Sequence, residues 1–343
     1  MSMFKFSAGP WNVSEGGDAF GPNVRQSISL EDKCKEFKNI GIEGVQFHDD
    51  DVVPDMNELS PDEIKSKARE VKELLDTYGL KAEFVAPRLW EDARTVDGAF
   101  TSNSEADREF ALYRAFRSVD IANELGCDLI GLWFAREGTL CAESKSAIEG
   151  INRIISSINS ILEYDATKKI FIEPKPNEPI DRSFCPTMGH VMAVSNATID
   201  PSRVGGLLES AHAILAGIDP ANEISFAMRF GKLFGVHLND QNGMKYDQDK
   251  TFGAENLRQA FNQIKVLVEN KFGSKGEYVG LDVKPMRTQR VETSYQHLKN
   301  SIAIVEKLER KALKFDYAYQ QACVEKRDYE SLEMYVINLL LQD

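Results

Sequence analysis

The sequence predicts an α/β protein built as a (β/α)8 TIM barrel with a C-terminal helical arm. Eight short apolar segments alternate with helical stretches along its 343 residues, and no linker rich in Gly, Ser or Pro divides them. Most of these segments lack the alternation of polar and apolar residues that is typical of half-exposed strands. Strands that are buried on both faces and joined by helices favour a parallel sheet, and eight such units favour a closed barrel.

The expected strands are short runs of aliphatic, aromatic and β-branched residues. They span residues 4–8, 44–47, 81–85, 129–133, 170–172, 204–208, 234–238 and 278–281. The first run ends at Gly9 and Pro10, a pair that favours a turn.

The expected helices are marked by the residues at their ends. Ser29 and Ser60 are suitable N-cap residues for two helices that follow them. Gly79 and Gly126 would end two helices, because glycine easily adopts the left-handed conformation found after many helices. Isoleucines at helical spacing predict a further helix over residues 147–164.

The last part of the chain differs in character from the rest. From residue 294 it is helical and charged, and it is too short and too polar to form a core of its own. We therefore expect the barrel over residues 1–293 and a C-terminal helical extension over residues 294–343. Its expected role is packing or oligomerisation.

Charge and hydropathy exclude several classes of partner. Lys and Arg number 41 against 54 Asp and Glu, which gives a net charge of −13. This balance argues against binding to nucleic acid or to an anionic membrane surface, since both need a basic patch. No apolar run approaches the ~20 residues that span a bilayer, and the first residues lack the apolar segment of a secretory signal. We expect a cytoplasmic protein.

The five cysteines do not suggest a structural framework. Their number is odd, and no C-x-x-C pair occurs. The sequence therefore indicates neither a set of disulfide bonds nor a zinc site built from thiolates. We expect reduced cysteines with a structural role.

Function in such a barrel is expected just after the C-terminal ends of the strands. In this sequence the residues found there are Trp11, His48, Asp51, Trp90, Trp133, Arg136, Glu137, Glu173, Lys175, Glu178, Glu209, His212, His237, Asn239, Asp240, Asp247, Asp249, Asp282 and Lys284. A single carboxylate in such a position is more often a helix cap or a surface charge. Here such residues follow several different strands, which favours a shared site.

Residues 173–179 are the most informative segment. They follow the apolar run at 170–172, with Pro174 between Glu173 and Lys175 and Pro176 directly after Lys175. Because proline fixes φ and prevents helix formation, these two side chains leave the strand on a stiff, extended segment. Such stiffness suits two charged groups that must point at one small target.

Two spacings predict metal ligands. Glu209 and His212 are three residues apart, close enough on a helical turn to chelate one ion. Asp247 and Asp249 offer two further carboxylates on a loop. Oxygen-rich ligands with one or two imidazoles favour Mg²⁺ or Mn²⁺, with Co²⁺ as a possibility. If Glu209 belongs to two clusters, it could bridge two metal ions.

The chain resembles the xylose isomerase family of (β/α)8 barrels in several short motifs that occur in the same order. These are residues 18–21 (DAFG), 47–51 (FHDDD), 97–101 (DGAFT), 133–138 (WFAREG), 173–179 (EPKPNEP), 209–217 (ESAHAILAG), 245–249 (KYDQD) and 282–288 (DVKPMRT). Together they cover nearly the whole chain, and a recurring resemblance is more specific than any single motif.

The resemblance implies an aldose–ketose isomerase that uses two divalent cations and a 1,2-hydride shift on a small-molecule sugar. It implies that Glu173, Glu209 and Asp282 bind a structural cation, and that Glu209 also serves a catalytic cation. The further implied roles are His212, Asp247 and Asp249 on the catalytic cation, Lys175 beside the sugar carbonyl, His48 with Asp51 in ring opening, and Trp11, Trp90 and Trp133 as an aromatic wall. We also place Lys284 among the substrate-binding residues.

Two features depart from the family pattern. The position that is usually an aspartate in xylose isomerases is His237 here. Imidazole is a competent ligand, and histidine serves in related L-rhamnose isomerases, so we include His237 among the metal ligands. The C-terminal arm is shorter than in typical members. We expect a homo-oligomer, either a dimer or a tetramer, in which Phe20 enters a neighbouring subunit's pocket as in the family.

Three alternatives share the barrel. A ketose epimerase or an inositol-type dehydratase usually needs one metal ion and carboxylate bases, so Lys175 and the Asp247-x-Asp249 pair favour the isomerase. An endonuclease of this barrel type is disfavoured by the net charge of −13. A non-catalytic sugar-binding relative is disfavoured by the intact set of Lys175, His48 and metal ligands.

Overall fold

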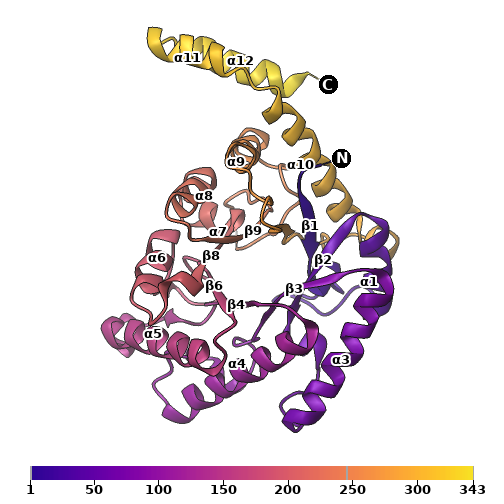
Figure 1. Ribbon diagram of the computed structural model, residues 1–343, viewed down its shortest axis with the longest axis vertical. Helices are drawn as coiled ribbons and strands as arrows, with labels where there is room; N and C mark the ends of the chain where they lie inside the picture. The colour runs from indigo at the N-terminus through magenta and orange to yellow at the C-terminus, as the bar shows by residue number, and fades with distance from the viewer. Residues whose placement is uncertain (1, 245, 343) are drawn as a thin grey trace.

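Eight parallel strands close into a barrel (Figure 1) in the computed structural model, which describes residues 2–244 and 246–342. Around the barrel they follow the order β1, β10, β9, β8, β6, β4, β3 and β2. Their bounds are β1 Lys5–Ala8, β2 Ile42–His48, β3 Lys81–Ala86, β4 Leu129–Trp133, β6 Lys169–Glu173, β8 Val204–Glu209, β9 Leu233–His237 and β10 Tyr278–Leu281. Every expected strand is present, and the predicted (β/α)8 barrel is confirmed.

Helices surround the barrel and connect its strands (Figure 1). Their bounds are α1 Leu30–Asn39, α2 Asp49–Val52, α3 Pro61–Tyr78, α4 Glu105–Leu125, α5 Ala147–Tyr164, α6 Met188–Asn196, α7 Ser210–Leu215, α8 Pro220–Arg229, α9 Leu257–Glu269, α10 Gln296–Leu313, α11 Tyr317–Lys326 and α12 Tyr329–Leu341. None of the helices in the described part of the chain is both long and apolar enough to cross a membrane.

The helix ends follow the residues that predicted them. Ser29 and Ser60 accept hydrogen bonds from backbone N–H groups of the first turn of α1 and α3. At α3 the Glu63 side chain completes a capping box by accepting from the Ser60 N–H at 2.8 Å. Gly79 and Gly126 end α3 and α4 with φ of 64° and 72°, a left-handed conformation that glycine adopts without strain.

A small second sheet fastens the proline-framed segment. It pairs β5 (Gly138–Thr139) with β7 (Arg182–Ser183) in antiparallel fashion. The Ser183 N–H also donates to the Pro176 carbonyl oxygen at 3.1 Å. The loop after β4 and the segment after β6 are thereby tied together beside the strand ends.

The core lies in two places. The larger part packs between the strands and the surrounding helices. A smaller cluster of strand residues comprises Phe84, Ala86, Phe171 and Leu207, all of which are buried. Three of these four, all but Leu207, also line the cavity described below, so they form its apolar floor.

The C-terminal helices divide into a packed part and a projecting part. α10 lies against α9, and His297 in α10 donates from Nε2 to the Asn12 carbonyl oxygen at 2.7 Å. α11 and α12 project beyond the ring of helices (Figure 1). Only Cys323 and Val336 are buried in these two helices. α10 is therefore bound to the barrel, and the division of the chain at residue 294 stays a prediction.

The five cysteines are all free, as their number and spacing predict. Cys34, Cys127, Cys185 and Cys323 are buried, and Cys141 is exposed. Burial raises the pKa of the Cys127 and Cys185 thiols to about 12, so both stay protonated at neutral pH.

Candidate active site

A cavity of about 710 Å³ opens at the C-terminal ends of the barrel strands. All the residues with a predicted role in the site line it except Asp51 and Phe20. Its apolar floor and its charged walls suit a small polar molecule that must be oriented, and its volume lies in the range of small-ligand sites. The positions taken from strand ends thus meet in one place, as the barrel topology requires.

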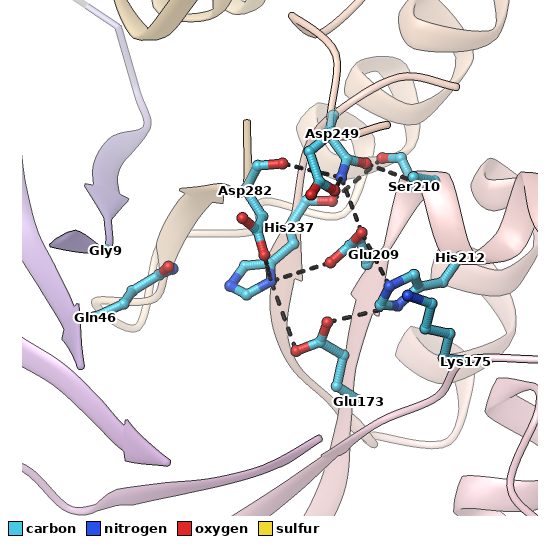
Figure 2. A network of polar contacts seen from close by, with 12 residues as sticks. Gly9, Gln46, Glu173, Lys175, Glu209, Ser210, His212, His237, Asp249 and Asp282 are labelled. Carbon is cyan, nitrogen blue, oxygen red and sulfur yellow. Dashed lines mark hydrogen bonds and ion pairs between the residues drawn. The ribbon is translucent and has the colours of Figure 1, made fainter. Parts of the chain in front are cut away.

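Four side chains from four strands form the first group of candidate metal ligands (Figure 2). They are Glu173 at the end of β6, Glu209 at the end of β8, His237 at the end of β9 and Asp282 just after β10. The His237 Nδ1 atom lies 3.5 to 3.7 Å from one carboxylate oxygen of each of the other three. These four residues therefore converge on one point.

The first group has the properties of a cation site. Nδ1 of His237 is buried and has no hydrogen-bond partner among residues 2–244 and 246–342. Burial and the neighbouring carboxylates, Asp247 and Glu173 foremost, raise the pKa of Glu209 well above its usual range. Burial opposes a charged His237, but Glu173 and Asp282 outweigh that effect and raise its pKa to about 9. The cluster attracts positive charge, which a divalent cation would supply.

A second group shares Glu209 with the first. It consists of Glu209, His212 and Asp247, whose ligand atoms also lie close together. The His212 Nε2 atom is 3.2 Å from Glu209 Oε1 and 3.0 Å from Asp247 Oδ2. α7 begins directly after β8, and its first turn carries His212 back over Glu209. The arrangement fits a second cation bridged to the first through Glu209.

Lys175 stands beside the second group. Its Nζ lies 3.0 Å from Asp247 Oδ2 and 3.1 Å from Glu178 Oε2, and 5.1 Å from the ring centre of Trp133. Burial opposes its charge, but Asp247 and Glu178 outweigh burial and raise its pKa above the usual range. Lys175 therefore carries a fixed positive charge next to the cavity.

Asp249 lies outside both groups. Its Oδ1 accepts from the Asn239 amide at 3.0 Å, and its Oδ2 forms an ion pair with Lys284. The backbone at Asp249 is left-handed, with φ of 45°. Its role as a ligand, and the role of Lys284 toward substrate, stay predictions.

Asn239 is among the polar residues expected just after a strand, but no role was predicted for it. Its amide nitrogen donates to Glu209 Oε1 at 2.9 Å, to Asp249 Oδ1 at 3.0 Å and to the Asp282 carbonyl oxygen at 3.0 Å. It thus fixes the bridging carboxylate. Its place two residues after β9 was the available signal.

His48 is held by a partner that the sequence patterns missed. The guanidinium of Arg88 donates from Nη2 to His48 Nδ1 at 2.8 Å, and Asp51 Oδ2 lies 3.2 Å from the same atom. Nδ1 therefore lies between a guanidinium, which can only donate, and a carboxylate, which can only accept. Arg88 follows β3, so its position at a strand end was the signal.

The three tryptophans form a wall around His48 and Lys175. The ring centres of Trp11 and His48 are 4.2 Å apart, those of His48 and Trp90 are 5.0 Å apart, and those of Trp90 and Trp133 are 4.5 Å apart. Trp11 also donates from Nε1 to Asp282 Oδ1 at 2.9 Å. The wall therefore connects the first candidate metal group to the candidate proton carrier.

Phe20 lies apart from these residues. It is 83% exposed and stacks on Tyr246 with 6.3 Å between ring centres. Its neighbours Asp18 and Ala19 line the cavity, so the loop borders the entrance. The contribution of Phe20 to a second subunit stays a prediction.

Solved structures with the same fold include two epimerase-type proteins. A 3-keto-D-glucoside 4-epimerase from E. coli aligns with a TM-score of 0.63 and 15% identity, over 88% of this chain and 98% of its own. A D-tagatose 3-epimerase-like protein aligns with a TM-score of 0.64 and 18% identity, over the same shares. A xylose isomerase domain protein from Alicyclobacillus acidocaldarius aligns with a TM-score of 0.58 and 12% identity, over 89% and 99%. At these identities the likeness concerns the fold alone.

The family is identified from the amino-acid sequence. Residues 34–271, well over half of the chain, match the family described as xylose isomerase-like TIM barrel. The match agrees with the closed parallel barrel and with the motifs at its strand ends. The chain therefore belongs to the xylose isomerase-like TIM barrel family.

Proposed function

We propose that this protein is an aldose–ketose isomerase that binds two divalent cations, Mg²⁺, Mn²⁺ or Co²⁺. The observation that carries the proposal is the pair of ligand groups that share Glu209, with Lys175 beside the second group. His212 Nε2 and Asp247 Oδ2 lie 3.0 Å from each other next to a charged lysine, so a second cation would find two further ligands beside Glu209. The cavity volume of about 710 Å³ accommodates a sugar.

The reaction moves one hydrogen with its electron pair from C2 to C1 and one proton from the C2 hydroxyl to the oxygen at C1. When bound, the two cations would hold these neighbouring oxygens and polarise the carbonyl. Lys175 adds a fixed positive charge for the oxygen at C1. The tryptophan wall keeps water away from the reacting carbons.

His48 serves the opening of the cyclic sugar in this proposal. Its Nδ1 lies 2.8 Å from Arg88 Nη2, and its ring packs between Trp11 and Trp90. Imidazole can carry a proton to or from the sugar ring oxygen. Asp51 lies 3.2 Å from Nδ1 and holds the ring orientation.

A ketose epimerase is the second candidate. The first group alone offers one cation site with two carboxylates, Glu173 and Asp282, 3.7 Å and 3.6 Å from His237 Nδ1. Such a pair could remove and return a proton at one carbon. In that case the second group would have no part in the chemistry.

A panel of sugars tests the proposal. Metal-free protein is assayed with aldoses and ketoses of different length, with Mg²⁺, Mn²⁺ or Co²⁺ added in turn. Interconversion of an aldose and its ketose, dependent on added cation, is the expected result. Formation of only an epimer, with the carbonyl left at its carbon, would favour the second candidate instead.

A further inference from the structure

A buried polar layer lies inside the barrel beside the first group of candidate ligands. Ser7 of β1, Gln46 of β2 and Glu83 of β3 are on three neighbouring strands. The Gln46 amide nitrogen donates to Ser7 Oγ at 3.1 Å and to Glu83 Oε2 at 3.0 Å. The interior of such a barrel is usually filled by aliphatic side chains, so this layer needs a reason.

Two atoms at the edge of the layer lack partners. Gln46 Oε1 and His237 Nε2 are both buried, and neither has a hydrogen-bond partner within the described residues. Gln46 is fully buried, and His237 is 2% exposed. Buried polar groups without a partner are costly, so a fold retains them when a function uses them.

The side chains of Gln46 and His237 both pack against Gly280, which has no side chain of its own to separate them. Gly280 lies in β10 and pairs with Ser7 on one side and with His237 on the other. A Cβ atom at Gly280 would lie 2.5 Å from Gln46 Nε2 and 2.8 Å from His237 Cδ2. Figure 2 shows the Gln46 side chain pointing toward the ring edge of His237 that faces away from the carboxylates. The glutamine side chain and the imidazole therefore share the space next to Gly280.

The chemistry of the imidazole defines what Gln46 can do. His237 Nδ1 faces the carboxylates of Glu173, Glu209 and Asp282, so Nδ1 is the nitrogen that would bind a cation. A neutral imidazole that binds through Nδ1 carries its proton on Nε2 and needs an acceptor there. Both hydrogens of the Gln46 amide already have acceptors, which leaves its carbonyl oxygen for this purpose.

We propose that Gln46 is a positioning residue for His237: its side-chain oxygen accepts the Nε2–H proton and so fixes the tautomer and ring orientation in which Nδ1 binds the first cation. Ser7 and Glu83 fix the orientation of the Gln46 amide, and Gly280 provides the room. The inference rests on the cation site of the proposed function. It assigns the polar layer to that site, and it pairs Gln46 with a histidine where the family usually has an aspartate.

A double-mutant cycle on cation affinity tests this role without an activity assay. Metal-free protein is titrated with Mn²⁺ against a chelator, for the unsubstituted chain, Gln46→Leu, His237→Asp and the double variant. We expect Gln46→Leu to weaken one of the two sites by about 10- to 100-fold. In the His237→Asp background we expect no further loss, because aspartate has no N–H group to orient. Equal losses in both backgrounds, or no loss in either, would overturn the proposal.

A second measurement covers the case in which Gln46→Leu disturbs packing. Gln46→Met has a similar size, also lacks the acceptor, and should behave like Gln46→Leu in the cycle. In the Mg²⁺-bound protein with ¹⁵N-labelled histidines, the signal that His237→Asp removes should report a proton on Nε2, protected from exchange. A proton on Nδ1 of that residue would contradict the proposal.

The outcomes also separate this inference from the proposed function. If the unsubstituted protein binds no cation tightly, the site itself is absent and both proposals fail. If it binds two cations and the cycle shows no coupling between Gln46 and His237, only the positioning role fails.

Discussion

Lys175 shows how the surroundings of one residue define its role. Burial alone would favour the neutral amine, but Asp247 at 3.0 Å and Glu178 at 3.1 Å outweigh burial and raise its pKa. The ammonium therefore stays charged across the working pH range of most enzymes. A group that cannot lose its proton does not serve as a base, so we assign Lys175 an electrostatic role.

Replacement of Lys175 by methionine removes the charge and keeps the length of the side chain. We expect kcat to fall by about 100-fold or more, with two cations still bound, because the charge acts on the carbonyl oxygen. Lys168→Met is the matched control: Lys168 is also buried, but it contacts the Cys127 carbonyl oxygen away from the cavity. Steady-state kinetics and metal analysis check the pair. An unchanged kcat in Lys175→Met would remove the lysine from the chemistry.

Glu209 is the residue on which both cation sites depend. It is 1% exposed, belongs to both ligand groups and accepts a hydrogen bond from Asn239. Burial, together with crowding by other carboxylates, raises its pKa well above the usual range. Its charge is therefore stabilised mainly by whatever positive charge the two groups hold.

The variant Glu209→Gln keeps the shape of this side chain and removes its charge. We expect the affinity of both sites to fall by more than about 100-fold, together with activity, since a bridging ligand serves two ions. Glu137→Gln is the control, because Glu137 is equally buried but accepts hydrogen bonds from the backbone at Phe100 and Thr101. Cation titration of both variants decides the matter. Loss at one site alone would show that Glu209 does not bridge.

Among the helices, α10 is attached to the barrel through His297. Its imidazole is buried and donates to the Asn12 carbonyl oxygen at 2.7 Å. Burial, with a smaller contribution from the charge of Arg25, lowers the pKa of His297 to about 4, although the bond to Asn12 opposes this. The folded protein therefore holds His297 neutral, whereas the unfolded chain protonates it below about pH 6.5.

This difference predicts how stability depends on pH. The contribution of a neutral His297 is fully present above pH 6.5 and is lost as pH falls toward 4, because only the unfolded chain takes up the proton. Between pH 7 and pH 4.5 we expect a loss of about 2–3 kcal/mol in the free energy of unfolding. Denaturant unfolding of the unsubstituted chain and of His297→Gln measures it. The same pH dependence in both proteins would contradict this assignment.

The elements could be predicted because their signals are local. Apolar runs predicted all eight strands. Ser60 predicted the start of α3, and Gly79 and Gly126 predicted the ends of α3 and α4. The pair of β5 and β7 was not predicted, since strands of two residues have no periodicity. The position of Asp249 outside the second ligand group was not predicted either, because its contacts with Lys284 and Asn239 depend on the fold and not on sequence spacing. Gln46 and Arg88 were not predicted, because their contacts with Ser7, Glu83 and His48 arise only when the barrel brings distant strands together.

In the molecule as a whole, the projecting helices α11 and α12 leave several apolar side chains exposed to solvent. Met334, Ile337 and Leu341 on α12 are 53%, 37% and 79% exposed, and Val336 is the buried residue of that helix. Apolar side chains on a projecting helix mark a contact surface. We propose that α11 and α12 hold subunits together, in line with the expected dimer or tetramer.

Carboxylates introduced on the exposed apolar face of α12 should separate the subunits. We expect Met334→Glu combined with Ile337→Glu to shift the protein to monomers, because burying unpaired carboxylates in an apolar interface is costly. Sedimentation velocity measures the assembly state, and cation titration confirms that each barrel is intact. A protein that is monomeric without these substitutions, or an assembly that survives them, would refute the role of the arm.

The central claim is that hydrogen moves directly between two carbons of a sugar held in the barrel. The most direct test uses an aldose with deuterium at C2, converted in ordinary water by the protein loaded with Mg²⁺ or Mn²⁺, with the ketose product analysed by mass spectrometry and NMR. A hydride shift from C2 to C1 predicts that the deuterium is retained and found at C1. Loss of deuterium to water, with solvent hydrogen in its place, would contradict the hydride shift and point to proton transfer by a carboxylate such as Glu173 or Asp282.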